Sequence, residues 1–454
     1  MNKIFSPNAL SILELLHHSG YEAYLVGGCV RDYLLKRAIN DYDITTNARP
    51  EELKELAERN HQKILTIGIK HGTITFVVNH EPIEVTTYRF DGNYQDFRHP
   101  SEVTFATDLT DDLSRRDFTI NSICSDGTKI IDMFHGQQDL KAKTIRCIGD
   151  ADTRFNEDAL RILRAIRFSI QLNFTIEHNT YEAIKRNAFK IKYLSVERIR
   201  DELIKMLSCN SHDLLKLLRD SGILPIIIPE YQEIYDIKQE TFYHCYDVFD
   251  HINATINAAR DEDYSMRLAL LLHDIAKARH KSIDEHGQAH FKGHAQTSSL
   301  MAYAIMNCLK FPKRVNEEVT ALIKNHDYHL HNDPKILHRF MYYLNGDFAF
   351  ASRLLKLEYY DNCGKNPAFF TDANAELRQI MQAINQMSKS DECYNLSKLK
   401  ISGHDLIKLG YHDAEIGLAL DYLLKRVINE QNLNQHEYLL NLARRNKNEI
   451  LSSQ

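Results

Sequence analysis

The sequence predicts an α+β protein, in which an α/β segment at the N-terminus precedes a helical region. Two observations lead to this prediction. Up to about residue 148, short runs rich in β-branched residues, at 63–67, 73–78 and 83–88, alternate with helical stretches and glycine-containing turns. From about Asp152 onward, apolar residues recur with the period of a helix almost to the end of the chain. A chain of 454 residues exceeds one hydrophobic core, so several domains are expected.

The segment 24–46 carries the first chemical motif. An apolar strand is expected to run into a turn at Gly27 and Gly28, and a helix to begin directly after it. Adjacent glycines let the backbone approach a ligand closely, and N–H groups at a helix start bind phosphate. The next expected strand carries Asp41 and Asp43, which point to one face because they are two residues apart. Two carboxylates on one face repel each other unless a divalent cation such as Mg²⁺ lies between them. The segment therefore predicts a nucleotidyl-transfer site.

A third carboxylate, Glu84, lies on a later apolar strand expected over 82–89. The G-x-G-x-x-G spacing that is typical of dinucleotide-binding folds is absent here, which argues against a dinucleotide site. We predict that Asp41, Asp43 and Glu84 are the catalytic residues and that Asp41 and Asp43 bind Mg²⁺.

These residues resemble the first motif of class II tRNA nucleotidyltransferases, the CCA-adding enzymes of the polymerase-beta-like superfamily. That motif pairs G-G-x-V-R-D with D-x-D, and the sequence matches it from Gly27 to Asp43. The agreement continues over 113–121 and 157–168, and the resemblance extends over essentially the whole chain. It implies a polymerase-beta-like nucleotidyltransferase head followed by an all-helical neck, body and tail. The implied domains are the head at 1–148, a neck that binds the nucleotide base and RNA at 149–205, a body with an HD domain at 206–345, and a tail that binds tRNA at 346–454.

The neck is expected to contain a helix that reads the incoming base. Asp158 and Arg161 lie three residues apart and share a helical face, while Arg164 and Arg167 step around it. Cytosine and adenine present an exocyclic amine beside a ring-nitrogen acceptor, whereas guanine and uracil present a carbonyl beside an N–H. A carboxylate next to a guanidinium therefore suits C and A and rejects G and U. A solvated, salt-bridged face is the alternative interpretation of the same spacing.

In the resembled family, an E-D-x-x-R motif reads the base, and this assigns the role to Asp158 and Arg161 with Glu157 as an orienting neighbour. The polar segment 91–100 is expected to be a loop. The resemblance implies that full CCA-adding enzymes keep such a loop and that CC-only relatives shorten it, which favours addition of the final A. The predicted nucleotide-binding residues are Gly28, Arg31, Arg116, Asp158, Arg161, Arg164 and Arg167.

A second constellation lies in the helical region. Residues 270–277 resemble the HD signature, and matching parts follow in a loop at 291–294 and after a later helix at 325–327. Imidazole and carboxylate ligands gathered from helices form a divalent site for metal-assisted phosphoester hydrolysis. A buried histidine–aspartate pair with a structural role is the alternative. The predicted ligands of this second divalent metal are His251, His273, Asp274 and Asp327.

Composition narrows the possible partners. The formal net charge of −6 argues against a uniformly basic coat, so RNA must be bound by a local patch, and residues 154–205 carry an excess of Lys and Arg over Asp and Glu. The eight cysteines show no paired spacing and are expected to be reduced. No apolar run approaches ~18 residues and the N-terminus lacks a signal pattern. We expect a cytoplasmic protein with no membrane contact and no obligate protein partner.

The leading hypothesis is template-independent addition of C, C and A to the 3′ end of tRNA. CTP and ATP would be the substrates and pyrophosphate the product of a two-metal nucleotidyl transfer. An A-adding enzyme or a poly(A) polymerase on the same fold is the first alternative. The second is a metal-dependent HD phosphohydrolase with a nucleotide-binding head. The paired carboxylates argue against a non-catalytic tRNA chaperone.

Overall fold

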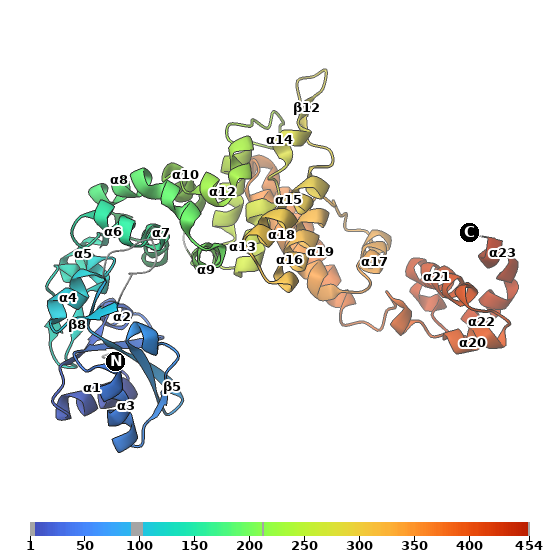
Figure 1. Cartoon of the computed structure of the whole chain (residues 1–454). Helices are drawn as coiled ribbons and strands as arrows, with labels where there is room; N and C mark the ends of the chain where they lie inside the picture. Colours follow the sequence, from blue (N-terminus) through green and yellow to red (C-terminus); the bar gives the residue numbers. More distant parts are fainter. Residues whose placement is uncertain (1–4, 92–102, 211–212, 453–454) are drawn as a thin grey trace. The chain divides into compact units, whose positions relative to one another are not determined.

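The computed structural model describes residues 5–91, 103–210 and 213–452. The chain forms two compact units, the first comprising 1–232 with 308–310 and the second comprising 233–307 with 311–454 (Figure 1). The expected class is confirmed, because a mixed sheet occupies the N-terminal unit and the rest is largely helical. The four-part division into head, neck, body and tail stays a prediction.

The first unit is built on a seven-stranded sheet with the order β3-β4-β5-β2-β1-β8-β9. Strands β2 and β5 pair in parallel and the other neighbours pair antiparallel. In Figure 1 the N-terminal strands are blue, with α1 (Pro7–His18) and α3 (Pro50–Arg59) beside them. The strands of the sheet are β1 (Ala23–Val26), β2 (Tyr42–Thr46), β3 (Lys63–Leu65), β4 (Thr73–Val78), β5 (Glu81–Thr87), β8 (Cys124–Ser125) and β9 (Ile130–Ile131).

Along the central strands, successive side chains point to opposite faces of the sheet, so that buried apolar residues lie on one face and the carboxylates on the other. Ile44 on β2 and its neighbours Ile83 and Val85 on β5 are at most 1% exposed. Residues between them point to the opposite face. Asp43 and Glu84 are such residues, and they are direct register partners across the parallel pair β2–β5. The sheet therefore places these two carboxylates side by side.

The remaining elements of the first unit connect and cover the sheet. Two further strand pairs, β6–β7 and β10–β11, lie outside it. These elements are α2 (Gly28–Leu34), β6 (Arg89–Asp91), β7 (Val103–Phe105), α4 (Leu109–Ser114), α5 (Gly136–Ala142), β10 (Thr144–Ile145), α6 (Ala151–Glu157), α7 (Leu160–Leu172), β11 (Thr175–Ile176), α8 (His178–Asn187), α9 (Val196–Leu207), α10 (Leu214–Asp220) and α11 (Leu224–Ile227). The loop expected over 91–100 lies, after residue 91, outside the described residues.

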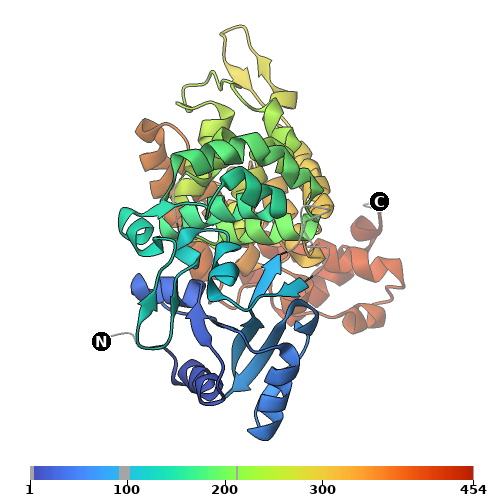
Figure 2. The ribbon, with the colours of Figure 1, turned by 60° about the vertical axis from the view of Figure 1, so that its left-hand side comes forward.

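The second unit is helical apart from the hairpin β12–β13, which projects from the helices in both ribbon views (Figures 1 and 2). Helices α12, α13, α16 and α18 pack together and bring distant parts of the sequence into one core. Its elements are α12 (Val248–Ala258), α13 (Tyr264–Leu272), α14 (Lys277–His280), β12 (Ser282–Ile283), β13 (Ala289–His290), α15 (His294–Cys308), α16 (Lys313–Asn325), α17 (Pro334–Tyr343), α18 (Phe348–Cys363), α19 (Pro367–Met387), α20 (Gly403–Lys408), α21 (Ala414–Asn429), α22 (His436–Arg445) and α23 (Lys447–Ser452). Over the described part of the chain, no helix is both long and apolar enough to span a bilayer.

Candidate functional site

A cavity of about 540 Å³ in the first unit gathers most of the predicted nucleotide-site residues. Seven arginines and five aspartates line it. Asp41 and Asp43 are among them, whereas Glu84 is exposed on β5 beside Asp43 and does not line the cavity. The predicted residues that line this cavity are Gly28, Arg31, Asp41, Asp43, Arg116, Asp158, Arg161, Arg164 and Arg167.

Unlike Asp32, Asp117 and Asp158 of the same cavity, Asp41 and Asp43 form no ion pair within the described residues. Asp41 precedes β2 rather than lying on it and is exposed, while Asp43 lies on the strand and is largely enclosed. Burial raises the pKa of Asp43 to about 6, with Glu84 and Asp41 adding to the shift and Arg116 opposing it. Because these donors are carboxylate oxygens only, they suit a hard divalent cation such as Mg²⁺.

The Gly-Gly turn lets an arginine approach the carboxylates. Gly27 has a φ of 77°, in the left-handed region that favours glycine. A Cβ atom at this position would lie 3.3 Å from Nη1 of Arg116 and 3.9 Å from Oδ2 of Asp43. The helix that follows begins at Gly28 and carries Arg31, whose guanidinium is bound by Asp32 and Asn121.

Asp158 does not lie on the same helix as Arg161, as the sequence predicted, because the helix is interrupted before α7. Asp158 lies between α6 and α7 in an extended conformation, and its Oδ1 accepts a hydrogen bond from the backbone N–H of Leu160. Aspartate favours such positions because its short side chain bonds nearby backbone N–H groups at helix starts. Its partner is Arg198, at 2.8 Å, rather than Arg161. Both predicted base-reading side chains nevertheless line the cavity.

Arg161 is held by groups of α6 and by the backbone that follows α4. Its Nη1 pairs with Glu157 and donates to the backbone oxygen of Arg154, and its Nη2 donates to the backbone oxygen of Arg115 at 2.6 Å. The side chain is only 9% exposed. Glu157 and two backbone oxygens therefore hold the guanidinium of Arg161 in one orientation.

The ring of Phe168 contacts three of the other arginines of the cavity, a role that the sequence did not indicate. The guanidinium carbons of Arg31, Arg164 and Arg167 lie 5.1, 5.2 and 4.1 Å from the centre of its ring. Such cation–π contacts hold the positive groups in place without neutralising them. The alternation of arginine with apolar residues at 161–168 is the sequence feature from which contacts between Phe168 and these arginines could have been predicted.

Two buried carboxylates form ion pairs with two of these three arginines. Arg164 donates to Asp117 at 2.7 Å, and Arg167 donates to Glu202 at 2.6 Å. Burial opposes ionisation of Asp117, but Arg164 outweighs it and lowers the pKa of Asp117 to about 2. The arginine side chains are thus positioned before any ligand arrives, which favours binding of a triphosphate.

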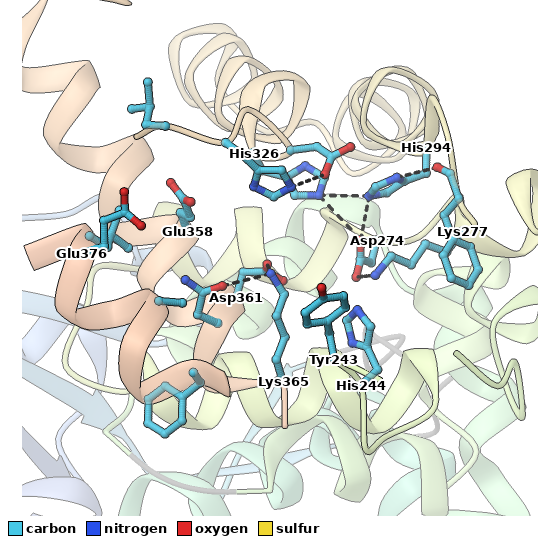
Figure 3. A pocket seen from close by; sticks show the side chains of 18 of the residues that line it. Tyr243, His244, Asp274, Lys277, His294, His326, Glu358, Asp361, Lys365 and Glu376 are labelled. Atoms are coloured by element: carbon cyan, nitrogen blue, oxygen red, sulfur yellow. Dashed lines mark hydrogen bonds and ion pairs between the residues drawn. The ribbon is translucent and has the colours of Figure 1, made fainter. Parts of the chain in front are cut away.

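The second candidate centre is a buried cluster in the helical unit. His251 on α12, His273 and Asp274 after α13, and Asp361 on α18 can offer ligand atoms within 4.8 Å of one another. A second group, Asp274 with His294 and His326, shares Asp274 with the first. Figure 3 shows Asp274 beside His294 and Lys277, and Asp361 of α18 beside Lys365, which follows that helix. The centre opens on a cavity of about 660 Å³.

The structure brings together three of the four predicted ligands of this centre. Asp327 lines the cavity but is half exposed, and its carboxylate faces His329 at 3.7 Å, outside both groups of the described residues. The second carboxylate of the first group, in addition to Asp274, is Asp361, whose Oδ1 lies 2.9 Å from Nε2 of His251 and 3.2 Å from Nε2 of His273. His326, one residue before Asp327, points inward because it closes α16.

Ion pairs neutralise the two buried carboxylates. Lys277 lies 2.7 Å from Asp274, and Lys365 lies 2.7 Å from Asp361. Burial lowers the pKa of His273, but Asp274 and Asp361 outweigh it and raise that pKa to about 9. Imidazole and carboxylate donors in a buried site of this kind suit a divalent transition metal.

Replacing Gly364 by alanine is expected to disturb this centre selectively. Its Cβ would lie 2.7 Å from Nδ1 of His251 and 2.7 Å from Cγ2 of Thr255, so His251 must move. We expect a loss of about 1–3 kcal/mol in the free energy of unfolding, and weaker binding of Ni²⁺ or Mn²⁺. Denaturant titration and metal titration measure both. Gly417→Ala is the matched control, since no atom lies within 4 Å of its Cβ; equal behaviour of the two variants would contradict the prediction.

Three protein families match successive parts of the chain. The family described as "Poly A polymerase head domain" matches residues 23–146, "Probable RNA and SrmB- binding site of polymerase A" matches 173–234, and "HD domain" matches 241–346. The head domain and the HD domain together imply divalent metals, in agreement with the buried cluster.

The chain is also similar to known CCA-adding enzymes. It is 50% identical to the CCA-adding enzyme of Lactobacillus helveticus over 199 residues, which are 44% of this chain and 49% of that protein. It is 41% identical to that of Staphylococcus aureus over 272 residues, which are 59% of this chain and 66% of that protein. The chain thus spans between about half and two thirds of the length of the curated relatives it matches.

Solved structures extend the similarity over the length of the chain. The crystal structure of the Bacillus stearothermophilus CCA-adding enzyme in complex with CTP has a TM-score of 0.71 at 25% identity, covering 98% of this chain and all of that one. The Thermotoga maritima CCA-adding enzyme complexed with tRNA shares the fold, with a TM-score of 0.59 at 20% identity over 99% and 97% of the two chains. The three family matches occur in the order poly(A) polymerase head, RNA-binding region and HD domain, and the chain is similar over nearly its whole length to a bacterial CCA-adding enzyme of known structure.

Proposed function

We propose that this protein adds C, C and A to the 3′ end of tRNA from CTP and ATP and releases pyrophosphate. The observation that carries the proposal is the cavity of the first unit, which is lined by Asp41 and Asp43 together with seven arginines. Carboxylates for a metal and guanidinium groups for a triphosphate are the two requirements of nucleotidyl transfer. The likeness to the CCA-adding enzymes supports the choice of tRNA, CTP and ATP.

In this proposal each side chain has a defined task. Asp41 and Asp43 would hold Mg²⁺, which would supply the positive charge that promotes ionisation of the 3′-hydroxyl and neutralises the triphosphate. Glu84 lies beside Asp43 and would complete or support the metal site. Arg116, Arg164 and Arg167 bind the negative charge of the incoming nucleotide, while Gly28 and Arg31 line the turn next to it.

Incubation with each of the four labelled nucleoside triphosphates tests this function. The substrate is a tRNA that lacks its CCA end, and the reactions run with and without Mg²⁺. We expect incorporation of C from CTP alone, of A once the C residues are in place, and none from GTP or UTP. Incorporation that does not require a divalent cation would contradict the proposed role of Asp41 and Asp43.

Replacing Asp158 by asparagine is expected to relax base selection. The amide keeps the size of the side chain but donates as well as accepts, so uracil and guanine are no longer rejected. The expected loss is about 1–3 kcal/mol of discrimination, measured as the ratio of kcat/KM for CTP and UTP. Arg161→Ala should act in the same direction but also loosens the contacts to Glu157 and Arg115.

Asp152→Asn is the matched control for base selection. Asp152 lies on α6 and pairs with Arg186, outside the arginine cavity. Its variant should keep the selectivity of the unaltered protein. If Asp158→Asn slows all four nucleotides equally, Asp158 does not read the base and specificity lies elsewhere.

The first alternative is a partial activity on the same fold, either an A-adding enzyme or a poly(A) polymerase.

A second candidate function belongs to the helical unit. The buried cluster around Asp274 opens on a cavity lined by Lys277, Lys292 and Lys365, which favours an anionic ligand. We propose that this centre binds a divalent transition metal and hydrolyses a small phosphoester, in addition to the activity of the head.

A further inference from the structure

Asp112 is a buried carboxylate that lies outside the cavity of the first unit but contacts residues that line it. It belongs to the short helix α4, and its side chain is fully buried. Asp112 does not line the cavity that contains Asp41 and Asp43. A buried charge is costly unless it is paired and hydrogen-bonded. The partners of Asp112 therefore indicate what this carboxylate does.

Two arginines and the strand of Asp43 share the carboxylate of Asp112. Its Oδ1 accepts hydrogen bonds from Nε and Nη2 of Arg115, at 3.0 and 2.5 Å. Its Oδ2 accepts one from Oγ1 of Thr45 at 2.9 Å and one from Nη2 of Arg116 at 3.2 Å. Thr45 follows Asp43 by two residues on β2, so both side chains point to the same face of the sheet. Asp112 thus joins Arg116 to the strand that carries a predicted metal ligand.

Arg116 keeps hydrogen-bond donors for a further partner. Its bond to Asp112 uses Nη2, and its buried Nε has no hydrogen-bond partner among the described residues. Its Nη1 and Oδ2 of Asp43 both border the space that a Cβ at Gly27 would fill, at 3.3 and 3.9 Å from that atom. In the described part of the chain Arg116 nevertheless pairs with Asp112 and not with Asp43. Opposite charges this close attract each other strongly in an enclosed site, so the bond to Asp112 is what opposes their pairing.

We propose that Asp112 is a positioning residue for nucleotide addition. It holds the guanidinium of Arg116 away from Asp43, so that the carboxylate of Asp43 stays available to a divalent cation. Because one carboxylate serves both Arg115 and Arg116, a net positive charge remains for the triphosphate. Without the charge of Asp112, Arg116 would pair with Asp43 and compete with the cation. The inference rests on the metal site proposed for Asp41 and Asp43.

Binding of Mn²⁺ to the full-length chain tests this role. Free Mn²⁺ is measured by electron paramagnetic resonance during a titration. The variant Asp41→Ala, Asp43→Ala is titrated in parallel and its binding is subtracted, so that ions held by the HD centre, the buried cluster around Asp274, are not counted. Asp112→Asn keeps the size of the side chain and an acceptor for Thr45 but loses the charge. We expect this variant to bind Mn²⁺ in the first unit about 10–100-fold more weakly.

A second substitution shows whether Arg116 is the competing group. The double variant Asp112→Asn, Arg116→Gln should bind Mn²⁺ as the unaltered protein does, because no guanidinium is left to pair with Asp43. Arg116→Gln alone should stay close to the unaltered affinity, since Asp112 already holds Arg116 away. The two substitutions are thus expected to be strongly non-additive. Equal and opposite shifts by the two single variants would mean that they act through charge at a distance, and would contradict the proposal.

Nucleotide addition provides a second readout. In Asp112→Asn the Mg²⁺ concentration for half-maximal addition should rise by the same factor as the weakening of Mn²⁺ binding, and the rate at saturating Mg²⁺ should fall less. Asp139→Asn is the matched control. Asp139 is also buried and accepts hydrogen bonds from a threonine and an arginine, Thr119 and Arg146, but does not line the cavity. Its variant should keep the unaltered Mn²⁺ affinity.

Two results would overturn the role of Asp112. One is unchanged Mn²⁺ binding by Asp112→Asn, and the other is weakened binding that Arg116→Gln does not restore. Asp112→Ser, which also removes the charge, replaces Asp112→Asn if that variant does not fold. Equal Mn²⁺ binding by the unaltered protein and by Asp41→Ala, Asp43→Ala would instead show that the first unit holds no ion. That result would overturn the proposed metal site and this inference together.

Discussion

Replacing Asp41 or Asp43 by alanine is expected to lower the rate of nucleotide addition by at least ~10³-fold. The reason is the loss of a metal ligand, because these two carboxylates face the arginine cavity. Binding of tRNA should stay largely intact, since the variants remove no basic group. Single-turnover incorporation of labelled CTP and a tRNA binding titration measure the two effects separately.

Asp41→Ala is the cleaner of the two variants. Asp41 is exposed, so its removal leaves the packing of the sheet unchanged, whereas Asp43 is largely buried. Glu55→Ala is a suitable control, because it removes one exposed carboxylate from α3 of the same unit. Near-normal addition by Asp41→Ala would refute the assignment of Asp41 as a metal ligand.

The double variant His273→Ala, Asp274→Ala is expected to abolish phosphoester hydrolysis by the HD centre and to leave nucleotide addition unchanged. Both side chains are at most 1% exposed and contribute directly to the ligand groups. They belong to a different compact unit from Asp41 and Asp43. We expect at least a ~10³-fold loss of hydrolysis, because a metal site without its ligands loses its ion.

Hydrolysis of a 2′,3′-cyclic phosphate and of pyrophosphate, with Ni²⁺, Mn²⁺ or Mg²⁺, provides the measurement. Nucleotide addition and circular dichroism are recorded on the same preparation. Because two buried polar groups are removed, Asp274→Asn alone serves as a milder second variant. Loss of nucleotide addition in a folded variant would show that the two sites are coupled and would refute their independence.

Local spacing predicted most of the nucleotide cavity. Gly27 and Gly28 form the expected turn, and Asp41 and Asp43 line one cavity although Asp41 precedes the strand. The direction of side chains along a strand and the formation of a glycine turn depend on a few neighbouring residues, so both can be predicted from the sequence. Asp158 was expected within a helix but lies between α6 and α7, where its side chain accepts a hydrogen bond from the backbone N–H of Leu160 at the start of α7.

Long-range packing decided what the sequence could not predict. Asp361 follows His273 by 88 residues and reaches the HD centre only because α18 packs against α12 and α13. Asp327 was predicted as a metal ligand because it follows a histidine in the sequence. At the end of α16, however, the side chain of His326 is buried and that of Asp327 is half exposed. The partners Glu202 and Arg198 likewise come from α9, a helix distant in sequence from those they contact.

The central proposal, complete CCA addition, is tested most directly with three tRNA substrates. One ends before the CCA sequence, one after the first C and one after the second C. Each is incubated with Mg²⁺, CTP and ATP, and the products are sequenced at the 3′ end. We expect all three to end in CCA with no further nucleotide. Extension of the third tRNA alone would identify an A-adding enzyme. Long A tails on any of the three would identify a poly(A) polymerase. Either result would contradict the proposal.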